Sequence, residues 1–145
     1  MAEQIPDQQG RLRYIDLAVP GAGIDPAYTQ DAATRWRLKS FLIEIVTSAD
    51  VASRYPSLIV TVGGILTASF PLHEAISASK ARILCWANQG SETQNVANGT
   101  MTGFLPGDYL VNNLAVISLD TVALQAADQY DAGRLVVEEW IEPLV

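Results

Sequence analysis

The sequence predicts an all-β protein, an antiparallel β-sandwich of jelly-roll type with about eight strands and minimal helix. Gly, Pro, Asn and Asp residues that favour turns recur about every 10 to 20 residues along the chain. Most segments between them alternate apolar and polar residues with the period of two that a strand requires. Because long amphipathic helical patterns do not separate these segments, we do not expect a parallel α/β sheet.

The length and composition indicate one domain with a single core. The chain has 145 residues, of which 49% are hydrophobic and only 17% charged. A chain of this size can bury roughly 70% of its unfolded surface, which is enough for a core without disulfides or metals. So few charges exclude a disordered chain or a coiled coil, since both need far more Lys, Glu and Arg.

The first strand is expected over residues 10–19, where polar and apolar residues alternate loosely. Successive side chains of a strand point to opposite faces. We therefore expect Leu12 and Tyr14 to face the core and Arg11 and Arg13 to lie on the opposite face.

The longest strand is expected over residues 35–47. Its apolar side chains occupy even positions at Trp36 and Leu38 but odd positions from Phe41 onward. A regular strand cannot change face in this way, so the pattern predicts a β-bulge near Ser40. Such a bend suits a strand that turns around the corner of a sandwich.

The segment from residue 55 to residue 73 contains no Asp, Glu, Lys or Arg. Its length alone would suit a transmembrane helix. However, it is rich in Val, Ile and Thr and is interrupted by Gly63 and Gly64. These features predict two buried strands, 58–62 and 65–70, joined by a two-residue turn.

The remaining strands are expected over residues 80–88, 100–105, 114–119 and 134–141. We expect a loop or one short turn of helix over residues 24–34 and a short helical link over 72–79. Residues 121–130, rich in Ala and Gln, are the best candidate for a helix.

The negative charge is confined to the last third of the chain. Residues 1–90 hold equal numbers of acidic and basic groups, so the whole net charge of −7 lies in residues 91–145, where Arg134 is the only base. A general nucleic-acid binder needs a basic face, so the charge excludes that function. The asymmetry indicates either an acidic strand paired with an arginine-bearing strand, or an electrostatic face for a partner.

Basic side chains recur two residues apart on two predicted strands, as Arg11 and Arg13 and as Arg35, Arg37 and Lys39. They form either a sheet face paired with acidic residues near the C-terminus or a docking stripe for an acidic neighbour. Both interpretations remain open. The candidate interface residues are Arg11, Arg13, Arg35, Arg37, Glu138 and Glu142.

The sequence offers little for catalysis, and we predict no enzyme activity, no cofactor and no metal site. His73 is the only histidine and follows a predicted strand, without a Gly-x-Ser-x-Gly motif to provide a nucleophile. Cys85 is the only cysteine, which excludes a disulfide framework, and we expect it to be buried. Glu138 and Glu139 are adjacent on one strand, so they point to opposite faces and cannot act as a carboxylate pair.

Two further sets of residues could bind ligands. Asp128 and Asp131 flank a predicted turn, where backbone hydrogen bonding explains them better than a loose calcium site. Trp36, Trp86 and Trp140 all fall within predicted strands and are expected to be core residues. Two tryptophans exposed side by side would instead favour a carbohydrate-binding module.

Three segments together resemble the small jelly-roll virion proteins that decorate or cement the capsids of tailed bacteriophages. Each segment consists of common strand and turn residues, and the likeness lies in their order and spacing. The segments are residues 35–41 (RWRLKSF) continuing into 47–54 (TSADVASR), residues 104–110 (FLPGDYL), and residues 124–131 (LQAADQYD) leading to 135–140 (LVVEEW).

The resemblance implies a structural role without catalysis. It implies a capsid decoration or cement subunit that binds the major capsid protein, forms a homo-oligomer (most simply a trimer) and lies on the capsid exterior. Residues 35–145 would form the jelly roll, and residues 1–34 would supply an N-terminal strand and loop able to act as a docking arm. Residues 1–10 lack the basic and apolar regions of a signal peptide, so we expect synthesis in the host cytoplasm. The net negative charge and the strand-like segment 55–73 further lead us to expect no nucleic-acid and no membrane partner. The alternative is a carbohydrate- or receptor-binding sandwich of a phage tail, spike or head fibre.

Overall fold

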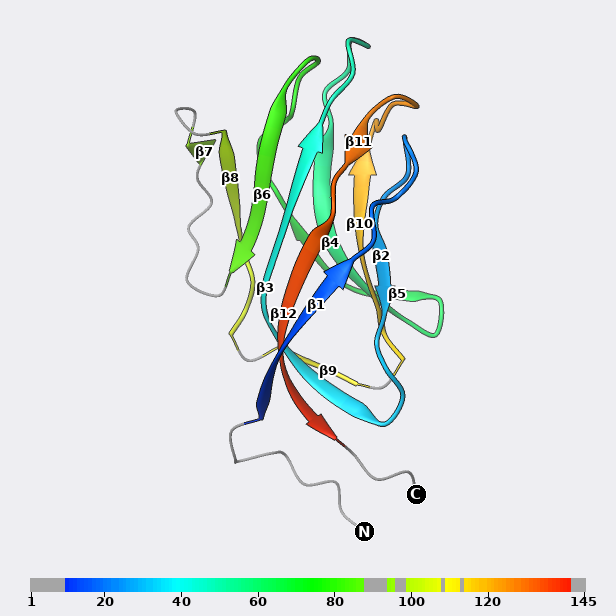
Figure 1. The fold of residues 1–145 in the computed structure, drawn as a ribbon, viewed down its shortest axis with the longest axis vertical. Coiled ribbons are helices and arrows are strands. Elements are labelled where there is room, and N and C mark those ends of the chain that lie inside the picture. The colour runs from blue at the N-terminus through cyan, green and yellow to red at the C-terminus, as the bar shows by residue number, and fades with distance from the viewer. Residues whose placement is uncertain (1–9, 88–93, 96–98, 108, 113, 142–145) are drawn as a thin grey trace.

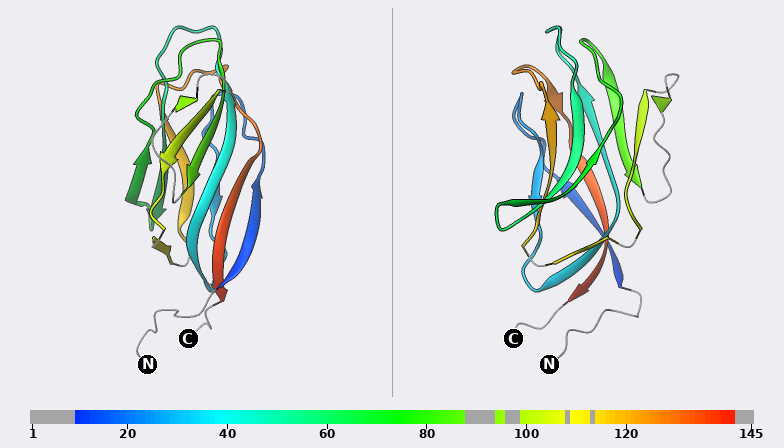
Figure 2. Two further views of the ribbon diagram at one scale, coloured as in Figure 1. Left: turned by 90° about the vertical axis from the view of Figure 1, so that its left-hand side faces the viewer. Right: turned by 180° about the vertical axis from the view of Figure 1, so that it is seen from behind.

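The computed structural model describes residues 10–87, 94–95, 99–107, 109–112 and 114–141. These residues form twelve strands and no helix, arranged as two sheets packed face to face (Figures 1 and 2). The strands are β1 (Arg11–Leu17), β2 (Ala27–Thr29), β3 (Thr34–Val46), β4 (Tyr55–Val62), β5 (Ile65–Pro71), β6 (Ala81–Ala87), β7 (Gln94–Asn95), β8 (Thr100–Phe104), β9 (Leu110–Val111), β10 (Val116–Val122), β11 (Gln129–Tyr130) and β12 (Gly133–Ile141).

The strand order is that of a jelly roll, which confirms the predicted fold class. The large sheet runs β1-β12-β3-β6-β8-β7, with β9 and β11 also paired to β3, and the small sheet runs β2-β10-β4-β5. Four strands of the large sheet, β1-β12-β3-β6, thus face the four strands of the small sheet. One detail differs from the antiparallel expectation, because β8 pairs with β6 in parallel.

The predicted bulge is present in the longest strand. Ser40 of β3 pairs with Val136 of β12, and Leu38 pairs with the next residue, Val137, so Lys39 has no opposite residue. The extra residue lets both Trp36 and Phe41 point into the core although their positions differ in parity.

The predicted hairpin is also present, but only one of its strands is buried. Gly63 and Gly64 both have positive φ, at 59° and 78°, as a tight two-residue hairpin turn requires. Every second residue of β4 is buried and those between are half-buried, whereas β5 is the edge of the small sheet and Ile65 is 72% exposed. The expectation of two buried strands was therefore wrong for β5.

The prediction for the first strand had its two faces reversed. Leu12 and Tyr14 are exposed, while Arg11 and Arg13 share their face with buried Ile15. This strand pairs with β12 along its full length, and β2 pairs with β10. Residues 11–29 are therefore part of the sandwich rather than an arm preceding it.

The core lies between the two sheets and includes side chains from both. Trp86 of β6 is fully buried, packs against Phe41 with ring centroids 5.9 Å apart, and donates its indole N–H to the Phe70 carbonyl of β5 at 2.9 Å. This hydrogen bond joins the large sheet to the small sheet. Gly103 of β8 leaves the space that the indole needs, since a Cβ there would lie 2.7 Å from the Trp86 ring.

Three connections differ from the sequence prediction. The short helical link expected over residues 72–79 contains no helix. Residues 121–130 are not helical, because β10 extends to Val122 and β11 occupies Gln129–Tyr130. The expected loop at 24–34 contains the short strand β2. In the last two of these places a sheet partner decides the conformation, and local composition does not reveal that partner.

Candidate functional site

Arg11 and Arg13 of β1 converge on a buried carboxylate of the neighbouring strand. Glu139 of β12 accepts hydrogen bonds from Nη2 of Arg11 and Nη1 of Arg13, each at 2.8 Å, and its Oε2 also accepts the Trp36 indole N–H at 2.8 Å. Burial alone would raise the pKa of Glu139, but the bonds from Trp36, Arg13 and Arg11 outweigh it and lower the pKa. The carboxylate is thereby held ionised beside the core.

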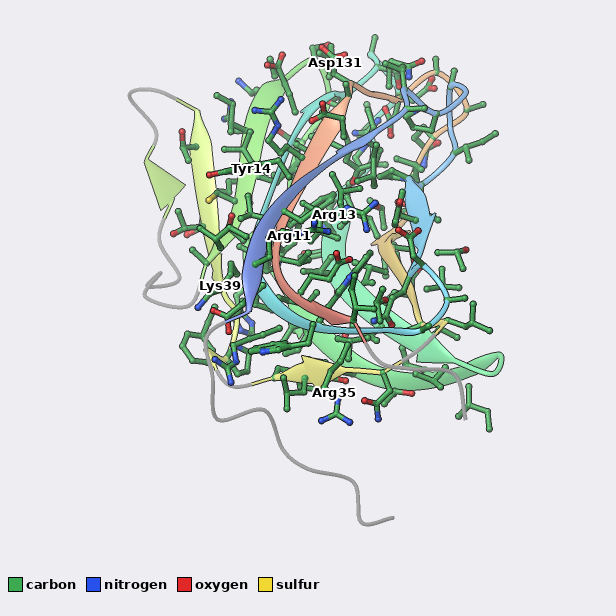
Figure 3. All side chains as sticks on the ribbon, turned by 60° about the horizontal axis from the view of Figure 1, so that its bottom comes forward. Arg11, Arg13, Tyr14, Arg35, Lys39 and Asp131 are labelled. Carbon is green, nitrogen blue, oxygen red and sulfur yellow. The ribbon has the colours of Figure 1, made fainter. Side chains whose placement is uncertain are left out.

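Arg13 extends this network toward the small sheet. Its guanidinium also donates to Asp31, and the other oxygen of Asp31 accepts a hydrogen bond from the Tyr28 hydroxyl at 3.4 Å. The guanidinium carbon of Arg13 lies 5.9 Å from the centroid of the Trp36 ring. Figure 3 shows Arg11 and Arg13 side by side on β1. The two arginines therefore connect β1 to β12, and Arg13 also reaches the loop before β3.

Arg37 and Glu138 form a second pair on the outer face of the large sheet. Their side chains are 3.2 Å apart across β3 and β12, and the guanidinium carbon of Arg37 lies 5.2 Å from the Trp140 ring centroid. Arg35, two residues earlier, is only 4% exposed. Glu142 lies outside the described residues.

Arg11, Arg13 and Arg37 of the candidate interface thus pair with acidic residues of the same chain. This is the arrangement expected if an acidic strand pairs with arginine-bearing strands within one fold. Glu138 and Glu139 point to opposite faces, as predicted, and each pairs with arginine. A role of these residues in contacts with another protein stays a prediction.

Connections between strands cluster at one end of the sandwich, at the top of Figure 1. We call residues 18–26, 47–54, 72–80 and 123–132 the loop end. Asp128 lies at its centre and is fully buried. Its carboxylate accepts hydrogen bonds from the backbone N–H groups of Ser48 and Gln125, at 2.7 and 2.8 Å. Its backbone carbonyl accepts a hydrogen bond from the Gly23 N–H at 2.7 Å. A single aspartate therefore links three of the connections.

Arg54 supplies the charge that this buried carboxylate needs. Its Nε and Nη2 lie 2.9 and 3.0 Å from the two Asp128 oxygens, and neither side chain is exposed. Burial alone would raise the pKa of Asp128, but the hydrogen bonds from Arg54 and from the Ser48 and Gln125 amides lower it to about 2. This pair was not predicted from the sequence. Its one local signal is an arginine directly before the uncharged segment 55–73.

An uncharged row crosses the outer face of the large sheet. Cross-strand pairing places five residues side by side on β1, β12, β3, β6 and β8. At the usual strand spacing the row is about 20 Å wide. Its ends are the most exposed, with Tyr14 at 64% and Phe104 at 49%. We call Tyr14, Val136, Ser40, Ala87 and Phe104 the Tyr14–Phe104 row.

The tryptophans, the cysteine and the histidine considered in the sequence analysis lie in the core, on the outer sheet face or on the loop end. Trp36 and Trp86 are fully buried, as predicted, whereas Trp140 is half-buried on the outer face. Cys85 is half-buried rather than buried, and burial raises the pKa of its thiol. His73 is exposed on the loop end.

Asp131, the second aspartate of the proposed turn, bonds the backbone and belongs to no metal site in the described residues. Asp131 accepts the Ala132 N–H at 2.7 Å in the short connection between β11 and β12, so its side chain bonds the backbone as its sequence context predicts. Among the described residues, no three His, Cys, Asp or Glu side chains are grouped so that they could hold a metal ion. No helix in the described part of the chain could cross a membrane.

Comparisons with known proteins find likeness only among solved structures. No family model and no curated protein matches the sequence. The fold is similar to a chain of the infectious bursal disease virus Gx strain (TM-score 0.43, 9% identity, 94% of this chain and 36% of that chain). It is also similar to a chain of the T13 particle of that virus (TM-score 0.43, 10% identity, 91% of this chain and 32% of that chain). A third similar structure is an exo-β-agarase (TM-score 0.36, 15% identity, 99% of this chain and 24% of that chain). This chain spans about a third of the virus chains, and similarity at this level assigns no function.

Proposed function

We propose that this chain is a structural virion protein, a capsid decoration or cement subunit of a tailed bacteriophage that binds the major capsid protein and stabilises the head. The observation that carries the proposal is the Tyr14–Phe104 row, a strip without charged side chains across five strands that is exposed at both ends and half-buried between them. Leu42, in the neighbouring row of the same face, is also exposed. A lack of charged residues together with exposed aromatic side chains such as Tyr14 and Phe104 is typical of the central part of protein–protein interfaces.

The jelly-roll strand order supports the same class of function. Jelly rolls build viral capsid proteins, lectins and cupins, so the fold narrows the function without deciding it. The sequence resemblance to phage decoration proteins favours the first of these. We further propose that the protein forms a symmetric homo-oligomer, most simply a trimer, on the outside of the head, and that it acts without catalysis or a cofactor.

The alternative, a carbohydrate- or receptor-binding module, would need an exposed aromatic platform. Trp36 and Trp86 are fully buried, so neither can stack on a sugar ring. Trp140 is half-buried beneath Arg37. We therefore rank this alternative second, and glycan binding by the purified protein would favour it.

The proposal is tested with heads assembled in the presence and in the absence of this chain. A protein that binds the assembled shell more tightly than its free subunits stabilises the shell by mass action. We expect heads lacking the chain to burst at a lower temperature, and purified protein added back to restore the burst temperature. The protein should also co-purify with intact virions at a fixed ratio to the major capsid protein. Heads of equal stability with and without the chain would rule out the cement role.

A further inference from the structure

Val51 is an apolar side chain that the fold holds out in water. It lies on the connection between β3 and β4, at the loop end, and is 98% exposed. The buried Arg54 side chain holds the residues on either side of Val51. Its Nη2 donates to the Asp50 backbone carbonyl at 3.0 Å, and its Nη1 donates to the Ala52 backbone carbonyl at 2.8 Å. The buried guanidinium that pairs with Asp128 therefore also sets the position of Val51.

From this geometry we propose that Val51 is the anchor with which the loop end docks into an apolar, basic-rimmed pocket on the assembled capsid shell. The inference rests on the proposed function and names the docking surface and the chemistry of the partner surface. An anchor held in its bound position loses little conformational entropy on binding, which is why preorganised side chains make effective contacts.

Two other connections of the loop end also carry apolar surface. Residues 18–24 of the β1–β2 connection contain no charged side chain, and neither do residues 123–127. They lie against each other, since a Cβ on Gly23 would be 2.9 Å from the Ala126 backbone. The larger exposed apolar side chains of these two segments and the adjoining end of β10 are Val19, Ile24 and Val122.

The charges of the loop end define the rim of the matching pocket. Its exposed carboxylates are Asp50, Glu74 and Asp131, whereas Lys80 is its one exposed Lys or Arg, in segments that the structure describes completely. Arg54 is buried and already paired with Asp128. Complementarity therefore requires Lys or Arg side chains around the pocket that receives Val51.

The test measures binding of the purified full-length protein to heads assembled without it. Val51→Asp places a charge where the anchor enters the pocket, and we expect it to weaken binding roughly tenfold or more, as for a central interface residue. Val51→Ala should weaken binding less, and Asp50→Lys should weaken it while reducing its salt dependence. Ile65→Asp is the matched control, because Ile65 is also exposed but lies at the β4–β5 turn, away from the loop end (Figure 1). Thermal melting should show that all four variants fold.

The outcomes separate the inference from the proposed function. Wild-type binding that Val51→Asp leaves unchanged would overturn the inference but leave the decoration role in place. Equal losses for Val51→Asp and Ile65→Asp would also overturn it, because the effect would not belong to the loop end. Absence of wild-type binding would overturn both. If sedimentation shows an oligomer that Val51→Asp dissociates, the surface joins copies of this chain, and the capsid pocket is wrong.

Discussion

Arg54 and Asp128, 74 positions apart in the sequence, form a two-pronged ion pair from which water is excluded. The distances from Nε and Nη2 to the two carboxylate oxygens are 2.9 and 3.0 Å. The pair connects the start of β4 to the segment before β11, and so ties two connections of the loop end together. Its contribution to stability and to the position of Val51 can be measured separately.

Replacing Arg54 alone should strongly destabilise the protein. Arg54→Met leaves the Asp128 carboxylate buried without its counter-charge, and we expect a loss of about 3–5 kcal/mol in the free energy of unfolding. Urea denaturation followed by tryptophan fluorescence measures this loss. Arg134→Met is the matched control, because Arg134 pairs with Asp16 at 2.7 Å on the exposed surface, where ion pairs contribute little. Equal losses for the two variants would contradict the burial argument.

The same pair should make stability depend on acid pH. The pKa of Asp128 is lowered from an ordinary 3.8 to about 2 in the folded protein, so the unfolded chain binds the proton more readily. The stabilisation is therefore complete above about pH 4 and is lost as the pH falls toward 2, with a total of about 2 kcal/mol. Unfolding free energies measured between pH 5 and pH 2 test this. Asp128→Asn should be less stable at neutral pH and show a shallower pH dependence. An unchanged slope would assign the acid sensitivity to other carboxylates.

Glu139 should matter more than its neighbour Glu138. Glu139→Gln replaces one acceptor oxygen with a donor amide and removes the charge that Arg11, Arg13 and the Trp36 indole all contact. We expect a loss of about 2 kcal/mol. Glu138→Gln is the matched control on the same strand, since the bond to Glu138 is a single one from the partly exposed Arg37 at 3.2 Å. Chemical denaturation should rank Glu139→Gln as the more damaging change, and the reverse order would contradict the network.

Gly103→Ala should disturb the contact between β8 and the core. The added Cβ would lie 2.7 Å from the Trp86 ring and 2.8 Å from Leu72, so the indole must move. We expect a loss of about 1–3 kcal/mol, as for other overpacked cores, and a change in tryptophan fluorescence. At Gly21 the nearest atom to a new Cβ is the end of the exposed Ile24 side chain, so Gly21→Ala is the control and should be nearly neutral. A Gly103→Ala protein with wild-type stability would show that β8 adjusts freely.

Much of the fold could be predicted from periodicity. The change of apolar parity between Leu38 and Phe41 located the bulge at Lys39 to within one residue, because a strand has only two faces and the core needs both side chains. Adjacent positions on one strand also separated Glu138 from Glu139 correctly. These inferences succeeded because strand geometry is local and strict.

The faces of β1 could not be predicted in the same way. Its apolar residues lie at even positions in the first half, Leu12 and Tyr14, and at odd positions in the second, Ile15 and Leu17. Without a bulge only one set can face the core, and a buried carboxylate on β12 makes it favourable for Arg11 and Arg13 to share that face. This choice depends on Glu139, which is 126 residues from Arg13.

By itself the sequence determined the class of fold, the bulge, the Gly63–Gly64 hairpin and the low charge of the surface, because each follows from the order of neighbouring residues. Only the tertiary structure decided which charged residues are buried and what they hold. Asp128 looked like a turn residue and Arg54 gave little signal, yet together they position the exposed Val51. The physical reason is that a buried charge is stable only beside its partner, and the chain must fold before that partner is near.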